Sequence, residues 1–570
     1  MNEATSGGRT MTPTKPAGRL QRHYRLMWDI NHGFESYFNP PMAPETVAMS
    51  HFGQFEGGPV DAYVGGIGPD AGYVTAFKSK KTQMEYLIDR YERGAVLGDL
   101  RYWKHAENLK RSAAAGVDHL EVHVDEAHRL GIDPWFRLSM NDWHHVDTGE
   151  GKVYRLGGSR FYEERLELMI GERGAAGWSD HPQHQEVMTC LQDYVHDEVR
   201  AMRRDIAIEV CERYDCTGFL FDFMRVPGYF AFGEERKNAH LMTQLIRETR
   251  QGLDEVAKTR GRPVGLAVRL PPTLDGTRRL GLDVEEWVAD HLVDVVVSSP
   301  FFAQDLEHDV SEWVALAADT PVTMLACLEE GYLAGHNGGF NRWFYNPPLM
   351  SDMTDEMIRG LAARHHDRGV DGIYVFNWFG SSLTYDHELA PILDDVVSPD
   401  RLRHRDKSYA LTRSHPSFPN CLKTERQIPV EVTSDATELH FDVVDDVTAN
   451  ADLVRATRLL LHLTNVSIDD DLEVTLNGAE VTNGNPLQPS TRGGNDAWQI
   501  FDLAENPPRA GQNVVTVRAR TRNERTAGEL PISVEDAEIE VSYEYPTGTL
   551  PARTGAYPGS PGAVGDRRGR

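Results

Sequence analysis

Residues 217–223 read TGFLFDF, a short run of apolar and aromatic residues that carries one carboxylate, Asp222. Runs of this kind are typical of strands that are buried on both faces, as in parallel sheets. Similar runs occur at 23–30, 61–67, 133–140, 263–270, 293–300, 321–328 and 372–378. Stretches with apolar residues at helical spacing separate them, among them 118–131, 196–214, 240–258 and 354–369. Eight strands that alternate with helices predict an α/β fold, a (β/α)8 TIM barrel over residues 21–400.

The pattern changes in the last quarter of the chain. Seven segments between residues 428 and 546 alternate apolar and polar side chains, and turn signals such as Asn477–Gly478 separate them. Short alternating strands without helices predict an all-β sandwich domain. We expect 401–427 to link the two domains. The ends, 1–20 and 547–570, are rich in Gly, Thr, Pro and Arg, which predicts disorder.

The composition narrows the classes of partner. The chain has 570 residues, with 59 Lys and Arg against 87 Asp and Glu, a formal net charge of −28. Nucleic acids require clustered basic residues, so this balance argues against them. No run approaches the ~18 apolar residues of a membrane span, and the first residues lack the apolar core of a secretory signal, which predicts a cytoplasmic protein. The five scattered cysteines predict reduced thiols rather than a disulfide framework.

Polar and aromatic residues follow the predicted barrel strands, where the active sites of such barrels lie. Carboxylates, amides and flat aromatic rings together are typical of a sugar-binding cleft. The residues are Asp29 and His32, Asn141 and Asp142, Asp222 and Arg225, Arg269, Glu329 and Glu330, and Asn377 and Trp378.

Asp222 is the most informative of these residues. Burying an unpaired carboxylate costs several kcal/mol. Asp222 therefore either pairs with Arg225 as a structural bridge or serves as a catalytic carboxylate. The two interpretations are compatible, because a nearby arginine keeps the acid ionised.

Glycoside hydrolysis requires a second carboxyl group, ~5–5.5 Å away for retention or ~6.5–9.5 Å away for inversion. The fourth and seventh strands are expected to face each other across the barrel, which predicts Glu329 or Glu330 as the partner of Asp222. Adjacent acids after a strand are also common on exposed loops. Parity along the strand does not decide between the two glutamates.

The remaining residues are predicted to bind substrate. Arg225 would orient Asp222, and Trp378 would stack on a sugar ring. Arg225 and Arg269 are alternatively suited to a uronic acid or a sulfate, which arginine binds through two hydrogen bonds. Sugar hydroxyl groups would bond to Asp29, His32, Asn141, Asp142 and Asn377.

Metal and cofactor motifs are missing from the sequence. There is no HExxH, EF-hand or GxSxG pattern, and the glycine-rich stretch 65–72 does not have the GxGxxG spacing. We therefore expect no metal and no cofactor.

Four segments resemble a known group of proteins. They are LMWDINHG (26–33), GIDPWFRLSMND (131–142), RYDCTGFLFDFMRVPGYF (213–230) and DGIYVFNWFG (371–380). They are similar to the glycosyl-hydrolase-like barrels described as family-10-like, which pair a barrel with a carboxy-terminal sandwich. The resemblance covers roughly residues 22–400, and it implies a (β/α)8 fold, action on glycosides and a catalytic role for Asp222.

The sandwich has a resemblance of its own. DLEVTLNGAEV (471–481), GQNVVTVRART (511–521) and DAEIEVSYEY (536–545) are similar to carbohydrate-binding-like sandwiches of the galactose-binding type. The segment shows no row of exposed aromatic residues, so we expect it to serve packing or homo-oligomerisation rather than independent sugar binding.

Together these patterns predict a glycoside hydrolase that acts on a poly- or oligosaccharide. Two alternatives stay open. One is a non-catalytic carbohydrate-binding barrel, and the other is a polysaccharide lyase that uses His32 or His145 as its base. A barrel that serves only as a scaffold would not bring the cleft acids together.

Overall fold

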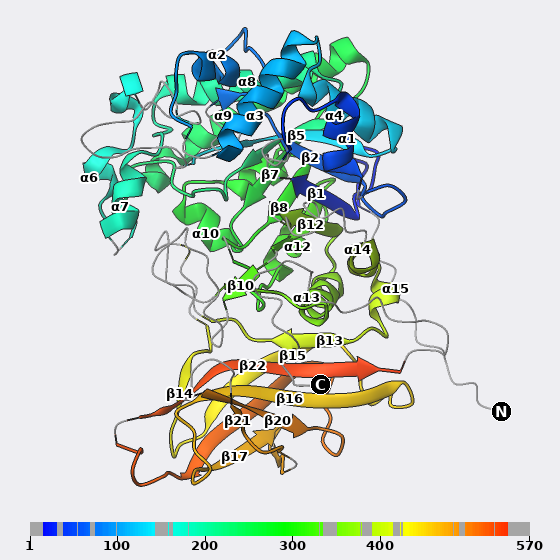
Figure 1. Ribbon diagram of the computed structural model, residues 1–570, viewed down its shortest axis with the longest axis vertical. Coiled ribbons are helices and arrows are strands. Elements are labelled where there is room, and N and C mark those ends of the chain that lie inside the picture. Colours follow the sequence, from blue (N-terminus) through cyan, green and yellow to red (C-terminus); the bar gives the residue numbers. More distant parts are fainter. Residues whose placement is uncertain are drawn as a thin grey trace, which may run out of the picture.

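The chain folds into a barrel domain and a sandwich domain that lie against each other (Figure 1). The structure is a computed structural model. It describes residues 15–30, 38–53, 55–68, 74–97, 100–142, 158, 163–179, 182–301, 303–329, 331–333, 350–376, 378, 390–413, 422, 426–482, 484–489, 496–528 and 530–544. The predicted disordered ends lie largely outside these residues.

Eight parallel strands close the barrel, which confirms the predicted fold. Each strand coincides with one of the eight apolar runs to within a few residues. The barrel is closed because the first strand pairs with both the second and the last. The strands are β1 (Leu26–Ile30), β2 (Ala62–Gly66), β5 (Asp133–Ser139), β6 (Gly218–Asp222), β7 (Gly265–Leu270), β8 (Val295–Ser298), β9 (Thr323–Glu329) and β12 (Gly372–Phe376), and their order around the barrel is β1-β12-β9-β8-β7-β6-β5-β2.

Helices surround the barrel and include all four predicted stretches. Caps fix several ends: the Asp118 carboxylate accepts from the Leu120 N–H at the start of α4, and Gly369 ends α13 in the left-handed region. None of the helices in the described part of the chain is long and apolar enough to cross a membrane. The helices are α1 (Pro44–Phe52), α2 (Leu87–Glu92), α3 (Leu100–Ala114), α4 (His119–Arg129), α6 (Gly171–Ala175), α7 (Pro182–Thr189), α8 (Asp197–Arg213), α9 (Glu235–Arg260), α10 (Leu274–Arg279), α11 (Val284–Ala289), α12 (Ser311–Ala317), α13 (Asp355–Arg368), α14 (Ala390–Val396) and α15 (Pro399–Leu402).

Two antiparallel sheets form the sandwich and enclose a second apolar core. One sheet has the order β13 (Lys407–Ala410), β22 (Ile532–Tyr543), β16 (Val454–Thr464), β20 (Asp496–Asp502) and β19 (Gln488–Pro489), with β14 (Val430–Val432) also beside β22. The other has the order β15 (Thr437–Val443), β21 (Gly511–Thr521), β17 (Asp471–Leu476) and β18 (Ala479–Glu480). All seven predicted segments contain strands.

Part of the expected linker belongs to the sandwich. β13 lies within 401–427 and pairs antiparallel with β22. This strand was not predicted because it begins with two polar residues, Lys407 and Ser408. Both are buried, since Lys407 donates to Asp445 at 2.8 Å and Ser408 donates to Glu538 at 2.7 Å. Polar residues in half of a four-residue strand leave too short an apolar run to predict it.

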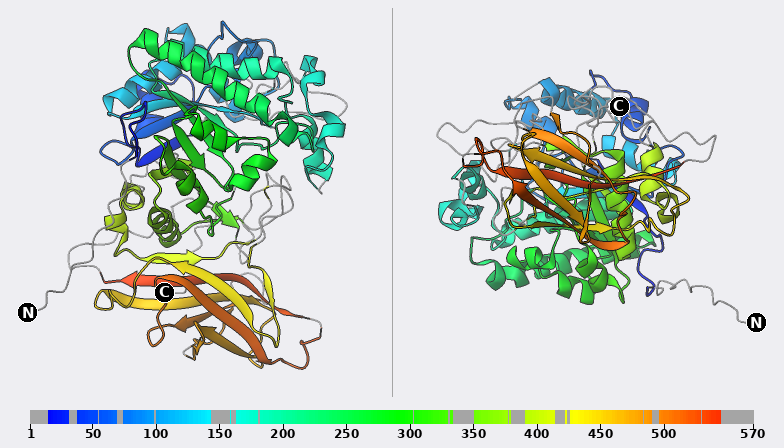
Figure 2. Two further views of the ribbon diagram at one scale, coloured as in Figure 1. Left: turned by 180° about the vertical axis from the view of Figure 1, so that it is seen from behind. Right: turned by 90° about the horizontal axis from the view of Figure 1, so that it is seen from below.

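The two domains are in direct contact. Helix α13 packs against β13 in the barrel-facing layer of the sandwich (Figure 2), and a Cβ added to Gly360 would come within 2.3 Å of the Ser408 carbonyl oxygen. Arg368 on α13 forms an ion pair with Asp442 on β15. A glycine in α13 therefore permits the close approach of helix and strand.

Glycines also make room for Trp135 at the amino-terminal end of the barrel. Trp135 on β5 is fully buried, and Gly218 and Gly265 begin the next two strands around the barrel. A Cβ on Gly265 would lie 2.4 Å from Trp135 Cη2. The indole ring occupies the volume that a side chain on either glycine would need.

We predict that Gly265→Ala destabilises the protein, because the buried indole has to shift to accept the methyl group. The free energy of unfolding should fall by about 1–3 kcal/mol, measured by urea denaturation. Gly528→Ala is the control, since nothing lies within 4 Å of its Cβ position. Equal stabilities of the two variants would contradict this packing.

Candidate active site

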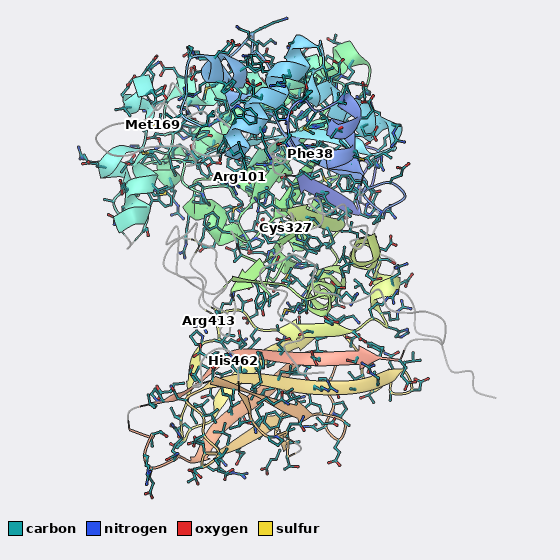
Figure 3. All side chains as sticks on the ribbon, in the orientation of Figure 1. Phe38, Arg101, Met169, Cys327, Arg413 and His462 are labelled. Atoms are coloured by element: carbon teal, nitrogen blue, oxygen red, sulfur yellow. The ribbon has the colours of Figure 1, made fainter. Side chains whose placement is uncertain are left out.

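Five charged side chains meet inside the barrel near the carboxyl ends of their strands. They are Asp29 on β1, Arg137 on β5, Asp222 on β6, Arg269 on β7 and Glu329 on β9, and none is more than 4% exposed. Figure 3 labels Cys327, which lies on β9 two residues before Glu329 and marks this part of the barrel. Successive side chains along a strand point to opposite faces of the sheet. These five residues point into the barrel, and their neighbours in sequence point toward the surrounding helices.

Arg269 connects the two predicted catalytic acids. Its Nη1 lies 3.3 Å from Asp222 Oδ1, and its Nη2 lies 2.7 Å from Glu329 Oε1. A single guanidinium thus bridges both carboxyl groups, which places them within about 10 Å of each other, the range used by two-carboxylate hydrolysis. Its Nε donates to Ser299 Oγ at 3.0 Å, and its Cζ lies 3.5 Å from the centre of the Phe376 ring.

Arg137 holds Asp222 from the other side. Its Nη1 lies 3.3 Å from Asp222 Oδ2, and its Nε donates to Asp29 Oδ1 at 3.1 Å. The Met224 N–H donates to Asp222 Oδ1 at 2.8 Å, and the Tyr374 hydroxyl donates to Asp29. Asp222 therefore accepts hydrogen bonds from two guanidinium groups and one backbone amide.

The charges in this cluster do not balance if every acid is ionised. Three carboxylates would face the guanidinium groups of Arg137 and Arg269. Burial raises the pKa of Glu329 to about 7. The negative charges of Asp222 and Asp29 also raise this pKa, whereas the positive charges of Arg269 and Arg225 lower it. Burial likewise raises the pKa of Asp29, against the effect of Arg137. With Glu329 protonated, two carboxylates balance two guanidinium groups, and the buried cluster is neutral.

The relative position of the two acids differs from the sequence prediction. β6 and β9 do not face each other, because only β7 and β8 separate them in the barrel, and the strand opposite β6 is β12. Asp222 and Glu329 approach each other through Arg269, which lies on one of the intervening strands.

The predicted pairing of Arg225 with Asp222 is also wrong. Arg225 Nε lies 3.5 Å from Asp142 Oδ2, and Asp222 pairs with Arg137 and Arg269 instead. Arg225 follows the end of β6, whereas the two arginines that reach Asp222 lie on the neighbouring strands β5 and β7.

Several predicted substrate ligands already have partners inside the protein. The Asn141 side-chain amide donates to the carbonyl oxygens of Gln192 and Gly228, at 3.1 and 2.6 Å. Trp378 is 6% exposed and packs edge-on against Trp28, with the ring centres 6.2 Å apart. All three side-chain nitrogens of Arg269 contact Asp222, Glu329 or Ser299, and its alternative role in uronate or sulfate binding stays a prediction. His32, His145, Glu330 and Asn377 lie outside the described residues.

Arg137 and Tyr374 belong to the cluster and were not predicted. Arg137 could have been predicted from the sequence, because it is a charged residue inside the apolar run 133–140. Asp222 occupies the same kind of position inside 217–223. Nothing in the sequence distinguishes Tyr374, because tyrosine is common in β-strands.

Comparisons with known proteins give only distant similarity. No protein-family model and no curated protein matches the sequence, so the family-10-like resemblance stays a prediction. Similar solved structures include a cycloisomaltooligosaccharide glucanotransferase from Paenibacillus sp., at 9% identity and a TM-score of 0.33 over 90% of this chain and 57% of that one. Another is the chitinase ChiW from Paenibacillus sp., at 10% identity and a TM-score of 0.38 over 87% and 52%. A third is the glycoside hydrolase domain of PgaB (BpsB) from Bordetella bronchiseptica, at 13% identity and a TM-score of 0.36 over 66% and 99%.

The chain thus spans just over half the length of the first two structures, 57% and 52%. At TM-scores of 0.38 or less, the similarity carries no argument about activity. The function therefore has to be inferred from the buried cluster itself.

We predict that Glu329→Gln removes a pH dependence of stability. The folded-state pKa of about 7 lies above the unfolded value of ~4.3, so the stabilising effect of the proton is complete below pH ~4 and is lost as the pH rises through 7. The amide of the variant cannot ionise, so the variant should gain on the order of 2 kcal/mol relative to wild type between pH 5 and pH 8.

Thermal or urea unfolding at the two pH values measures this difference. Glu255→Gln is the control, because the Glu255 side chain is 72% exposed and pairs only with Lys258 among the described residues. If the stability of Glu329→Gln changed with pH in the same way as that of wild type, Glu329 would already be ionised at pH 5, and the prediction would be wrong.

Proposed function

We propose that the protein is a glycoside hydrolase that cleaves a poly- or oligosaccharide with Glu329 and Asp222 as its two carboxyl groups. The observation that carries the proposal is the bridging of both groups by Arg269 at the carboxyl ends of the barrel strands, with one acid protonated near neutrality. The barrel position is the one at which enzymes of this fold place their chemistry.

Glu329 has the properties of the general acid. A pKa of about 7 keeps a large share of the group protonated at neutral pH, and a proton donor works best when its pKa is near the working pH. In this role Glu329 gives its proton to the glycosidic oxygen as the bond to the leaving sugar breaks.

Asp222 has the opposite role. Hydrogen bonds from Arg137, Arg269 and the Met224 N–H hold its carboxyl group in place. A carboxylate fixed beside the sugar stabilises the positive charge of an oxocarbenium-like transition state, and it acts there as the nucleophile or as the base that activates water.

We predict that Asp222→Asn and Glu329→Gln each lower the rate of glycoside hydrolysis by at least about 100-fold, the lower range for the loss of an acid or base. Reducing ends released from a panel of polysaccharides measure the rate. Asp275→Asn is the control, since its side chain is 63% exposed and pairs with Arg279 on the surface.

Thermal unfolding of each variant shows whether a lost rate reflects lost folding. Unchanged hydrolysis in a folded Asp222→Asn variant would contradict the proposal. So would a wild-type protein that releases no sugar from any polysaccharide of the panel.

A further inference from the structure

Two buried cysteines meet at the amino-terminal end of the barrel. Cys211 lies in the last turn of α8, and Cys216 lies in the short connection between α8 and β6. Both are free thiols without any exposed surface, and their Sγ atoms are 3.5 Å apart. The charged cluster of the candidate active site lies near the carboxyl ends of the strands, so the two cysteines form a separate site.

The two sulfur atoms are in contact and need little movement to bond. A disulfide bond is about 2.0 Å long, so closing it requires an approach of about 1.5 Å that two side chains share. Four residues separate the cysteines in the segment CERYDC (211–216), so the bond closes a small loop of chain. Only the last turn of α8 and the connection to β6 have to adjust.

Two arginines hold the backbone that carries these cysteines. Arg260, the last residue of α9, donates from Nη1 to the Cys216 carbonyl oxygen at 2.6 Å and from Nη2 to the Cys211 carbonyl oxygen. Arg262 donates to the carbonyl oxygen of Asp215 at 3.1 Å. These hydrogen bonds fix the connection against the end of α8, and they keep the two sulfur atoms close together.

The surroundings make the two thiols unequal. The hydrogen bond with Cys211 and the positive charges of Arg260 and Arg262 lower the pKa of Cys216, against the effect of burial. Burial raises the pKa of Cys211 well above its ordinary value. The thiolate is the reactive form of cysteine. Cys216 is therefore the attacking sulfur, and Cys211 keeps its proton until the second step.

We infer that Cys211 and Cys216 are a redox modification site and form a disulfide bond with hydrogen peroxide as the oxidant. The Cys216 thiolate attacks one peroxide oxygen and becomes a sulfenic acid, and the other oxygen leaves as hydroxide, which takes up a proton. The Cys211 sulfur then attacks Cys216 Sγ, and the sulfenic oxygen leaves as water with the proton of Cys211. The two thiols give up two electrons, and the peroxide is reduced to two molecules of water.

Burial determines which oxidant reacts. The oxidant has to be small and uncharged, as hydrogen peroxide is, and it enters when the last turn of α8 opens locally. A small dithiol such as dithiothreitol reverses the bond by thiol–disulfide exchange.

Peptide mass spectrometry of the full chain tests the inference. Trypsin cleaves after Arg204, Arg213 and Arg225, so the two cysteines fall in separate peptides, 205–213 and 214–225. After treatment with hydrogen peroxide and alkylation of the remaining thiols, we expect these two peptides to be joined, with a mass that is lower than their sum by two hydrogen atoms. Treatment with dithiothreitol before alkylation should abolish the joined peptide.

Two serine variants separate the roles of the cysteines. In Cys211→Ser the reaction should stop at a sulfenic acid on Cys216, which dimedone traps. In Cys216→Ser the trapping at Cys211 should be at least tenfold weaker, because Cys211 keeps its proton. Cys190→Ser is the control, since Cys190 is the more exposed thiol and its removal should leave the joined peptide unchanged.

Three results would overturn the inference. One is peptides 205–213 and 214–225 that stay separate at a peroxide concentration that oxidises Cys190. Another is a disulfide that joins Cys190 to one of the two cysteines in place of the pair. The third is equal dimedone labelling of the two serine variants. None of these measurements involves sugar release, so they do not depend on the proposed hydrolase function.

Discussion

The interior of the barrel depends on the guanidinium group of Arg269. This side chain contacts Asp222 and Glu329, donates to Ser299 and stacks on Phe376, so it connects β7 to β6, β9 and β12 and to the residue that follows β8. Removing one member of a buried ion pair leaves an uncompensated charge, at a cost of about 3–5 kcal/mol. The register of these strands is therefore fixed by charge as well as by apolar packing, because a shift of one residue would turn the acids toward the helices.

The same electrostatic reasoning applies to the whole buried cluster. In the barrel, two guanidinium groups and two carboxylates balance once Glu329 holds a proton, so the cluster needs nothing from outside to be neutral.

The sequence predicted the fold well because strands of a parallel barrel are buried on both faces and appear as continuous apolar runs. β13 was not predicted, because its buried Lys407 and Ser408 form hydrogen bonds with residues that are distant along the chain. The two catalytic candidates were visible for the same reason as the strands: Asp222 lies within an apolar run and Glu329 directly follows another.

The pairing of the charges was not visible in the sequence. Arg225 is near Asp222 along the chain, and Arg137 and Arg269 are near it only once β5 and β7 have paired with β6. Barrel closure sets these distances, and no local spacing encodes them. The partners of Asn141 were not visible either, because its side-chain amide donates to the carbonyl oxygens of Gln192 and Gly228, which are distant along the chain.

The most direct test of the account is the protonation state of Glu329 itself. Infrared difference spectroscopy of wild type against Glu329→Gln, titrated from pH 5 to pH 9, isolates the carboxylic acid band of this side chain. The account predicts a band that is present at pH 5, disappears with a midpoint near 7, and is missing from the variant. A wild-type spectrum identical to that of the variant across this range would contradict a protonated acid in the barrel.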